Sequence, residues 1–146
     1  MDSIIKNIDD NLNVGGVLIG SCFDGNKVFN KLLSKTINQG ITGIKNGEWM
    51  WKIDKKYSKT EFPDNINSLG LAIDVTMISI GKIIPEYLVN FNYFISRLSE
   101  LGIELLTPDE CSILDLPKID GVKKSTGMFE DIFKMKQDEY ADIDPR

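Results

Sequence analysis

The chain has 146 residues and a formal net charge of −5 at pH 7, with 42% of its residues hydrophobic and 27% charged. This length and composition are typical of one globular domain with a buried core. No apolar run approaches the roughly 18 residues that span a bilayer, and the acidic, amphipathic residues 1–13 do not resemble a signal peptide, so we expect no membrane partner. The acidic balance argues against binding nucleic acid mainly through its phosphates, so any RNA ligand should be contacted at its end or through a base.

The residue types present also exclude several kinds of chemistry. The chain has no histidine, which excludes Ser-His-Asp and Cys-His nucleophilic machinery and histidine-based proton transfer near neutral pH. Cys22 and Cys111 are the two cysteines, too few for a zinc site, which usually has about four nitrogen or sulfur ligands, and for a disulfide framework. We therefore expect two reduced thiols and no metal site.

The chain opens with a predicted helix. Apolar residues at near-helical spacing indicate a helix over residues 2–12, with Asp2 or Ser3 as the residue that caps its start. Gly15 and Gly16 are expected to end this helix and turn the chain.

A short strand and a second helix are predicted next. The apolar run 17–20 is consistent with a buried parallel strand, and the apolar positions of residues 26–34 predict a helix after it. Ligands of open α/β sheets bind at the carboxyl ends of strands, so the loop 20–25 is the first place to look for a site.

The middle of the chain predicts strands and a long helix. Residues 46–57 and 69–78 are rich in β-formers, and the turn-rich stretch between them predicts an antiparallel pair laid onto the core fold. Pro85 at a first helical turn predicts a helix over 85–101. Two further elements are predicted, a strand at 103–106 and an amphipathic helix at 127–140.

Three stretches, taken in order, resemble one family. They are GGVLIGSCFDG at 15–25, LGLAID at 69–74 and PEYLVNF at 85–91, and in this order and spacing they resemble mRNA cap guanine-N7 methyltransferases. The form IGSCFDG resembles the capping enzymes of large DNA viruses, and NGEWMWK at 46–52 resembles the family's β-rich insert. The resemblance covers roughly residues 3–110, and PEYLVNF is its most specific element.

The resemblance implies an α/β fold, a partial class I (Rossmann-like) methyltransferase sheet with an antiparallel β insert at about 46–78. Residues 1–146 would form the C-terminal part of a methyltransferase domain, with a cap-pocket helix at about 85–101. The family's S-adenosylmethionine site lies on motifs that precede this region, so we expect the cofactor to be bound elsewhere and assign it no residue here. The implied partners are 5′-capped RNA and the remainder of a capping enzyme, in the cytoplasm, a viral factory or a virion, or in the nucleus if the source is cellular.

The family's guanine-binding glutamate corresponds to Glu86. A carboxylate can accept hydrogen bonds from guanine N1–H and N2–H₂, a pair of donors that no other base offers. The alternative is a carboxylate in the first turn of a helix that complements the helix dipole. No catalytic residue is expected, because in-line methyl transfer to N7 depends mainly on proximity and orientation.

Three neighbours complete the predicted cap pocket. Phe23 and Asp24 lie in the loop where the family lines that pocket. Phe23 stands where cellular members of the family have proline, and its aromatic ring could stack on the base. The alternative for Phe23 is ordinary loop packing, and the alternative for Tyr87 is packing in the core or at its rim. Asp74, Glu48 and the pair Lys123-Lys124 are weaker candidates, for which solvated surface charges are the alternative.

Two functional hypotheses follow. In the first, the chain is the cap-binding half of an mRNA (guanine-N7) methyltransferase, part of an enzyme but inactive by itself. In the second, it is a non-catalytic, methyltransferase-like subunit that stabilises a capping enzyme. An α/β domain of another role is the remaining alternative.

Overall fold

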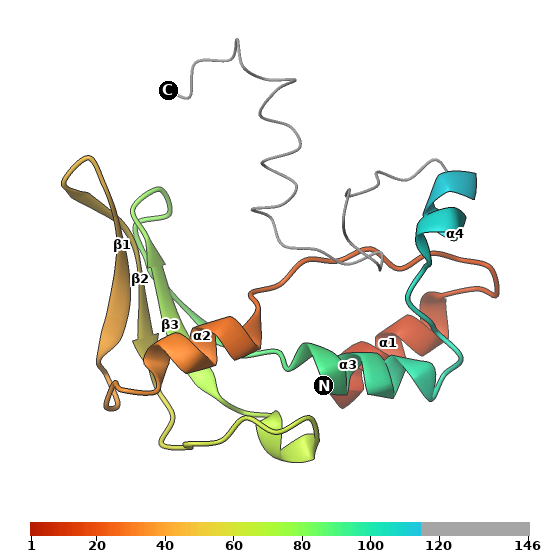
Figure 1. Ribbon diagram of the computed structural model, residues 1–146, viewed down its shortest axis with the longest axis horizontal. Coiled ribbons are helices and arrows are strands. Elements are labelled where there is room, and N and C mark those ends of the chain that lie inside the picture. The colour runs from red at the N-terminus through yellow and green to blue at the C-terminus, as the bar shows by residue number, and fades with distance from the viewer. Residues whose placement is uncertain (115–146) are drawn as a thin grey trace, which may run out of the picture. The chain divides into compact units, whose positions relative to one another are not determined.

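The computed structural model describes residues 1–114, which fall into two compact units that divide after Leu101. The first unit contains three α-helices, a short 3₁₀ helix and four strands (Figure 1). Their bounds are α1 (Asp2–Asn11), α2 (Gly25–Leu32), β1 (Gly40–Lys45), β2 (Glu48–Lys55), η1 (Ile66–Ser68), β3 (Ala72–Met77), β4 (Ile83–Tyr87) and α3 (Phe91–Ser99).

The strands form one antiparallel sheet in the order β1-β2-β3-β4. Asn46 and Gly47 connect β1 to β2, and both have positive φ angles, 54° and 84°, as a tight two-residue hairpin requires. Trp51 of β2 lies across Gly43 of β1, where a Cβ atom would come within 2.2 Å of the indole ring. The glycine therefore provides the space that the tryptophan ring occupies.

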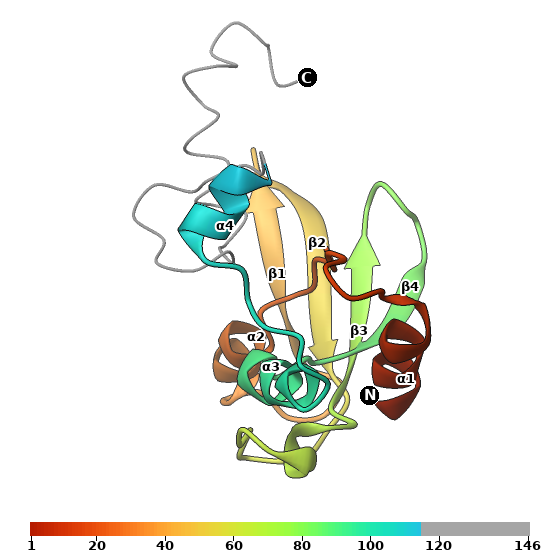
Figure 2. The ribbon, with the colours of Figure 1, turned by 90° about the vertical axis from the view of Figure 1, so that its right-hand side faces the viewer.

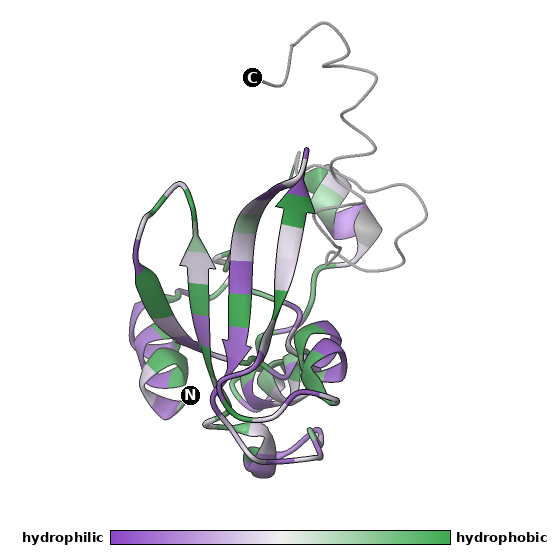
Figure 3. Cartoon of the chain, turned by 90° about the vertical axis from the view of Figure 1, so that its left-hand side faces the viewer, coloured by the Kyte–Doolittle hydropathy of each residue, from purple (hydrophilic) through white to green (hydrophobic). Residues whose placement is uncertain are grey.

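Within the described residues of the first unit, helices cover one face of the sheet and leave the other open, as Figures 2 and 3 show from opposite sides. Side chains alternate along a strand, so one set of positions faces the helices. The core on that side joins three residues of α2 with residues of the sheet and its connections: Val28, Phe29, Leu32, Ile53, Tyr57, Leu71, Ile73, Val75 and Leu88. The open face carries charged residues, among them Lys52, Asp54 and Asp74.

The predicted antiparallel pair is confirmed as β2 and β3, and the helix predicted over 26–34 is confirmed as α2. The α/β class is confirmed as well. The structure adds β1 and β4 on the two edges of that pair, so the sheet is wider than the predicted insert. Within residues 1–114 every strand pair is antiparallel.

The first predicted strand is wrong. Residues 17–20 are extended but belong to no sheet, and Ile19 is 78% exposed. An apolar run of this kind becomes a strand only when neighbouring strands accept its backbone hydrogen bonds, and the described residues offer none to it. The predicted cap of the preceding helix is also wrong, because Met1 is the N-cap and no side chain bonds there.

The long helix predicted over 85–101 is wrong in its first part. Residues 83–87 form β4, and α3 begins only at Phe91, capped by Asn90, whose side-chain oxygen accepts a hydrogen bond from the Tyr93 amide at 3.0 Å. Pro85 is compatible with β4 because β4 is an edge strand, and amides on the outer side of an edge strand have no neighbouring strand to bond.

The second unit is described only over residues 102–114. It contains α4 (Pro108–Ile113), which starts with a capping box in which the Glu110 amide donates to the Thr107 hydroxyl and the Thr107 amide to the Glu110 carboxylate. The Thr107 amide first, and the Thr107 hydroxyl second, donate to the Glu110 carboxylate and lower its pKa. The strand predicted at 103–106 is not formed. The predicted helix at 127–140 and the pair Lys123-Lys124 lie outside the described residues.

Candidate functional site

Glu86 lies on β4, on the helix-covered face of the sheet. It stands opposite Ile73, which is fully buried, and residues paired in this way share a face. Leu88, two residues further along, is also buried on that side. Glu86 is a half-buried residue, and its carboxylate makes no hydrogen bond or ion pair with the rest of residues 1–114. A carboxylate in apolar surroundings without a partner is a candidate for binding a ligand.

The loop that contains Phe23 and Asp24 lies beside the same segment. The Phe23 ring packs against the core cluster that includes Leu88. Gly25, the first residue of α2, approaches the backbone of Val89 so closely that a Cβ atom would lie 2.2 Å from the Val89 carbonyl oxygen. The fold therefore brings the 20–25 loop and the PEYLVNF stretch together.

Asp24 has a structural role in this loop. It is the N-cap of α2, and its carboxylate accepts a hydrogen bond from the Lys27 amide at 2.9 Å. Its charge also acts on Cys22, where burial first and Asp24 second raise the pKa of the thiol. A raised pKa leaves less thiolate at neutral pH, so Cys22 is a poor nucleophile.

Tyr87 lies on the opposite face of β4 from Glu86. It pairs with Ala72 and is 68% exposed. Successive side chains of a strand point to opposite sides, so one ligand on the helix-covered face does not reach both residues. The fold brings Phe23 and Asp24 to the side of the sheet on which Glu86 lies, and it does not bring Tyr87 there.

The weaker candidates on the sheet have ordinary surroundings. The Asp74 carboxylate lies 2.8 Å from the Lys56 ammonium on the open face. Glu48 is exposed at the start of β2, opposite Lys45. Both fit the alternative interpretation of solvated strand charges.

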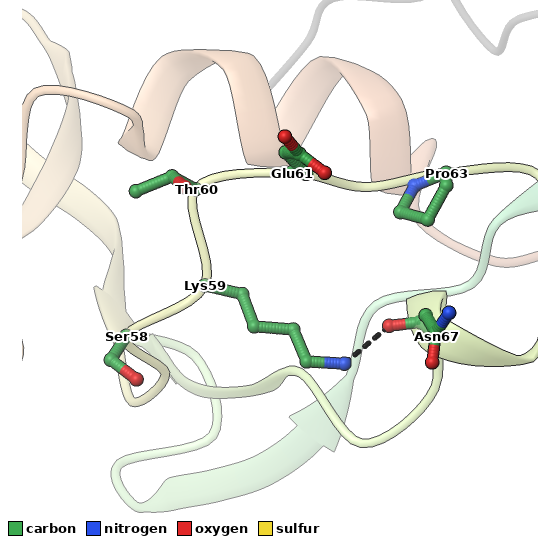
Figure 4. A pocket seen from close by; sticks show the side chains of 6 residues that line it. All are labelled: Ser58, Lys59, Thr60, Glu61, Pro63 and Asn67. Carbon is green, nitrogen blue, oxygen red and sulfur yellow. Dashed lines mark hydrogen bonds between the residues drawn. The ribbon is translucent and has the colours of Figure 1, made fainter.

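A polar hollow of about 360 Å³ lies in the loop between β2 and β3 (Figure 4). A hydrogen bond from the Lys59 ammonium to the Asn67 carbonyl crosses it. Its lining consists of Ser58, Lys59, Thr60, Glu61, Pro63 and Asn67, and includes none of the predicted site residues. Over residues 1–114 no three histidine, cysteine, aspartate or glutamate side chains gather as a metal site needs. None of the helices in that range has the length and apolarity to cross a membrane.

The sequence holds a signal that the site prediction did not use. Between Asp24 and Glu48 there is no acidic residue, although the chain as a whole is acidic. The same stretch holds the lysines Lys27, Lys31, Lys35 and Lys45. Scanning the sign of charge along the chain would have revealed this basic segment next to the predicted cap loop.

The chain is similar to a protein described as a probable mRNA-capping enzyme of Acanthamoeba polyphaga mimivirus. The two are 36% identical over 119 residues, which take in 74% of this chain and 9% of the viral protein. The chain thus corresponds to about 9% of the length of the curated relative that it matches. No protein-family model and no solved structure matches the chain. The similarity supports a relationship to mRNA-capping enzymes.

Proposed function

We propose that this chain is the cap-guanine-binding part of an mRNA (guanine-N7) methyltransferase. The single observation that carries the proposal is Glu86, a half-buried residue whose carboxylate has no partner within residues 1–114. It lies on the face of the sheet whose core cluster Phe23 packs against. The similarity of the chain to a probable viral mRNA-capping enzyme supports a function related to mRNA capping. Such a part would be inactive alone and would act with the remainder of the enzyme.

In this proposal Glu86 accepts hydrogen bonds from N1–H and N2–H₂ of the cap guanine. Once the bound base shields the carboxylate from water, these bonds would be stronger than in water, and the carboxylate would also favour the cationic ring of the N7-methylated product. Phe23 would provide a face on which the base or ribose stacks. These residues would hold the base so that N7 faces the methyl donor.

S-adenosylmethionine, which supplies the methyl group in such enzymes, does not fit the described residues. Gly15, with a φ of 79°, turns the chain into an exposed extended segment, whereas a nucleoside site needs a glycine-rich turn that leads from a strand into a helix. The cofactor would be held by another part of the enzyme.

The exposed segment 17–20 supports a further part of the proposal. Its apolar side chains and unpaired backbone fit a strand of a Rossmann-like sheet whose neighbouring strands come from the remainder of the enzyme. The same exposed segment also fits a second candidate function. It could dock a non-catalytic, methyltransferase-like subunit onto a capping enzyme and stabilise that enzyme.

Calorimetric titration with the cap dinucleotide m7GpppA separates the two functions. The cap-binding function predicts that wild-type chain binds the dinucleotide and that Glu86→Gln weakens binding by about tenfold to a hundredfold, since charged hydrogen bonds are worth about 1.5–3 kcal/mol each. Glu48→Gln, an exposed strand glutamate, is the matched control and should bind as wild type does. Equal affinity of wild type and Glu86→Gln, or no binding by wild type, would exclude the cap-binding function.

A further inference from the structure

The chain contains a basic segment within an acidic sequence. Residues 25–47 include Lys27, Lys31, Lys35 and Lys45 and no acidic residue, although the net charge of the chain is −5. A local reversal of charge on this scale creates a field that attracts anions even when the whole molecule is negative.

The structure places half of these lysines on α2. Lys27 and Lys31 are one helical turn apart, so they lie on the same side of the helix, and both are exposed. Their ammonium groups have no hydrogen-bond or ion-pair partner within residues 1–114. Lys35 follows just after the helix ends. The other side of α2 is occupied by the core residues, so its free side is cationic.

Helix stability does not explain Lys27. It lies in the first turn of α2, where the partial positive charge of the helix dipole disfavours a cation. Lys31, in the last turn, is favoured by the dipole, but the same argument makes Lys27 unfavourable. An anionic ligand would stabilise an unpaired lysine at this unfavourable position.

The cationic side of α2 begins at the candidate cap site. Gly25 contacts the backbone of Val89, and Phe23, two residues before the helix, packs against the cluster that contains Leu88. In Figure 1 α2 runs from the side on which α3 lies toward the sheet, and its end leads into β1. A chain that leaves the candidate site along α2 would therefore pass Lys27 and then Lys31.

We propose that the outward side of α2 binds the first phosphates of the RNA that follows the cap, through Lys27 and Lys31. This inference rests on the proposed cap-binding function, and it names the path that the substrate takes from that site. Contacts with so few phosphates are compatible with an acidic chain, because they require only a local positive surface. The interaction is independent of RNA sequence, since lysine binds phosphate as a point charge.

The test measures binding of the full chain to short RNAs as a function of salt. The probes are the cap dinucleotide GpppA, a capped pentanucleotide and a 5′-triphosphate pentanucleotide without a cap. For single strands, each phosphate contact adds about 0.7 to the magnitude of the slope of log affinity against log salt concentration. The double variant Lys27→Gln/Lys31→Gln loses two such contacts, so the slope for both pentanucleotides should become smaller by about 1.4. Affinity for GpppA should not change.

A charge-matched control is available on the sheet. Lys45 and Lys82 are exposed, have no partner among the described residues and lie at the ends of hairpins, so Lys45→Gln/Lys82→Gln removes the same charge away from α2. This variant should keep the wild-type slope. An equal loss of slope in both double variants, or no loss in either, would overturn the inference. Polyglutamate that binds as tightly as RNA with the same lysine dependence would also overturn it and identify an acidic protein as the partner.

The two proposals fail in different ways. If cap preference depends on Glu86 but the slope does not depend on Lys27 and Lys31, the RNA path is wrong and cap binding stands. If the slope depends on these lysines but capped and uncapped pentanucleotides bind equally, cap binding is wrong and the phosphate-binding surface stands.

Discussion

Lys55 of β2 should be a main determinant of how firmly α2 is held on the sheet. Its side chain is 5% exposed, and its ammonium group donates hydrogen bonds to the carbonyl oxygens of Leu32 and Lys35, both at 3.1 Å. The same ammonium lies 4.9 Å from the centroid of the Tyr57 ring. Lys55→Met keeps the volume of the side chain and removes all three interactions, so it tests the value of this buried charge.

The expected loss follows from opposing contributions. Two charged hydrogen bonds contribute about 1.5–3 kcal/mol each, and burying the ammonium costs several kcal/mol in return. In the variant the Leu32 carbonyl keeps the Lys35 amide, 3.0 Å away, but the carbonyl of Lys35 loses its donor, at a cost of about 1–3 kcal/mol. We expect Lys55→Met to lower the free energy of unfolding by about 2 kcal/mol. With a slope of about 2 kcal/mol per molar urea, the midpoint should fall by about 1 M.

Urea titration followed by tryptophan fluorescence measures this change, because Trp51 is partly buried against the core. Lys56→Met is the neighbouring control. Lys56 pairs with Asp74 on the exposed face, and such ion pairs contribute about 0–1 kcal/mol. A midpoint for Lys55→Met equal to or above that of wild type would refute the reasoning, because burial of the charge would then cost at least as much as its contacts contribute.

Three further predictions concern the core and the loop before α2. Tyr57→Phe should be neutral or stabilising in urea titrations, since the buried hydroxyl has no hydrogen-bond partner among the described residues. Burial raises the Tyr57 pKa to about 12. The unfolded chain therefore ionises this tyrosine first, and the wild type should lose stability as the pH rises from about 10 through 12. Urea titrations repeated across that range should show that Tyr57→Phe lacks the part of this loss that Tyr57 causes. Gly25→Ala should lower the unfolding free energy by about 1–3 kcal/mol, because the new methyl group would overlap the Val89 carbonyl, and thermal unfolding measures this. Alkylation of Cys22 at pH 8 should be slower than that of a free thiol, and Asp24→Asn should accelerate it only in part, since burial is the larger cause of the raised pKa.

Elements with a strong local pattern were predictable, and those that depend on distant partners were not. The alternation in β2 and β3 and the apolar face of α2 are properties of short stretches, which is why they were identified correctly. β1 was missed because Gly40 and Gly43 weaken its strand character, and the reason for Gly43 is the Trp51 ring on the neighbouring strand. The Asn-Gly dipeptide after β1 is a hairpin signal that the sequence did contain.

β4 shows how one residue can mislead. Pro85 is compatible with the first turn of a helix and with an edge strand, and the choice between them depends on which strand pairs with it. The alternation of Ile84, Glu86 and Leu88 toward the helix-covered face favours the strand, but three positions carry little weight in a sequence. The error placed Glu86 in a first helical turn, and the helix-dipole alternative for it disappears with that helix.

The position of Glu86 on β4 sharpens the argument for its function. On this face its strand neighbours are apolar, and Ile73 opposite it is fully buried. An apolar residue at position 86 would suit these neighbours, whereas the Glu86 carboxylate gains no partner within residues 1–114. The described fold therefore gives this carboxylate no structural role. A ligand that donates hydrogen bonds into this face would supply the missing partners, and a guanine edge is such a ligand.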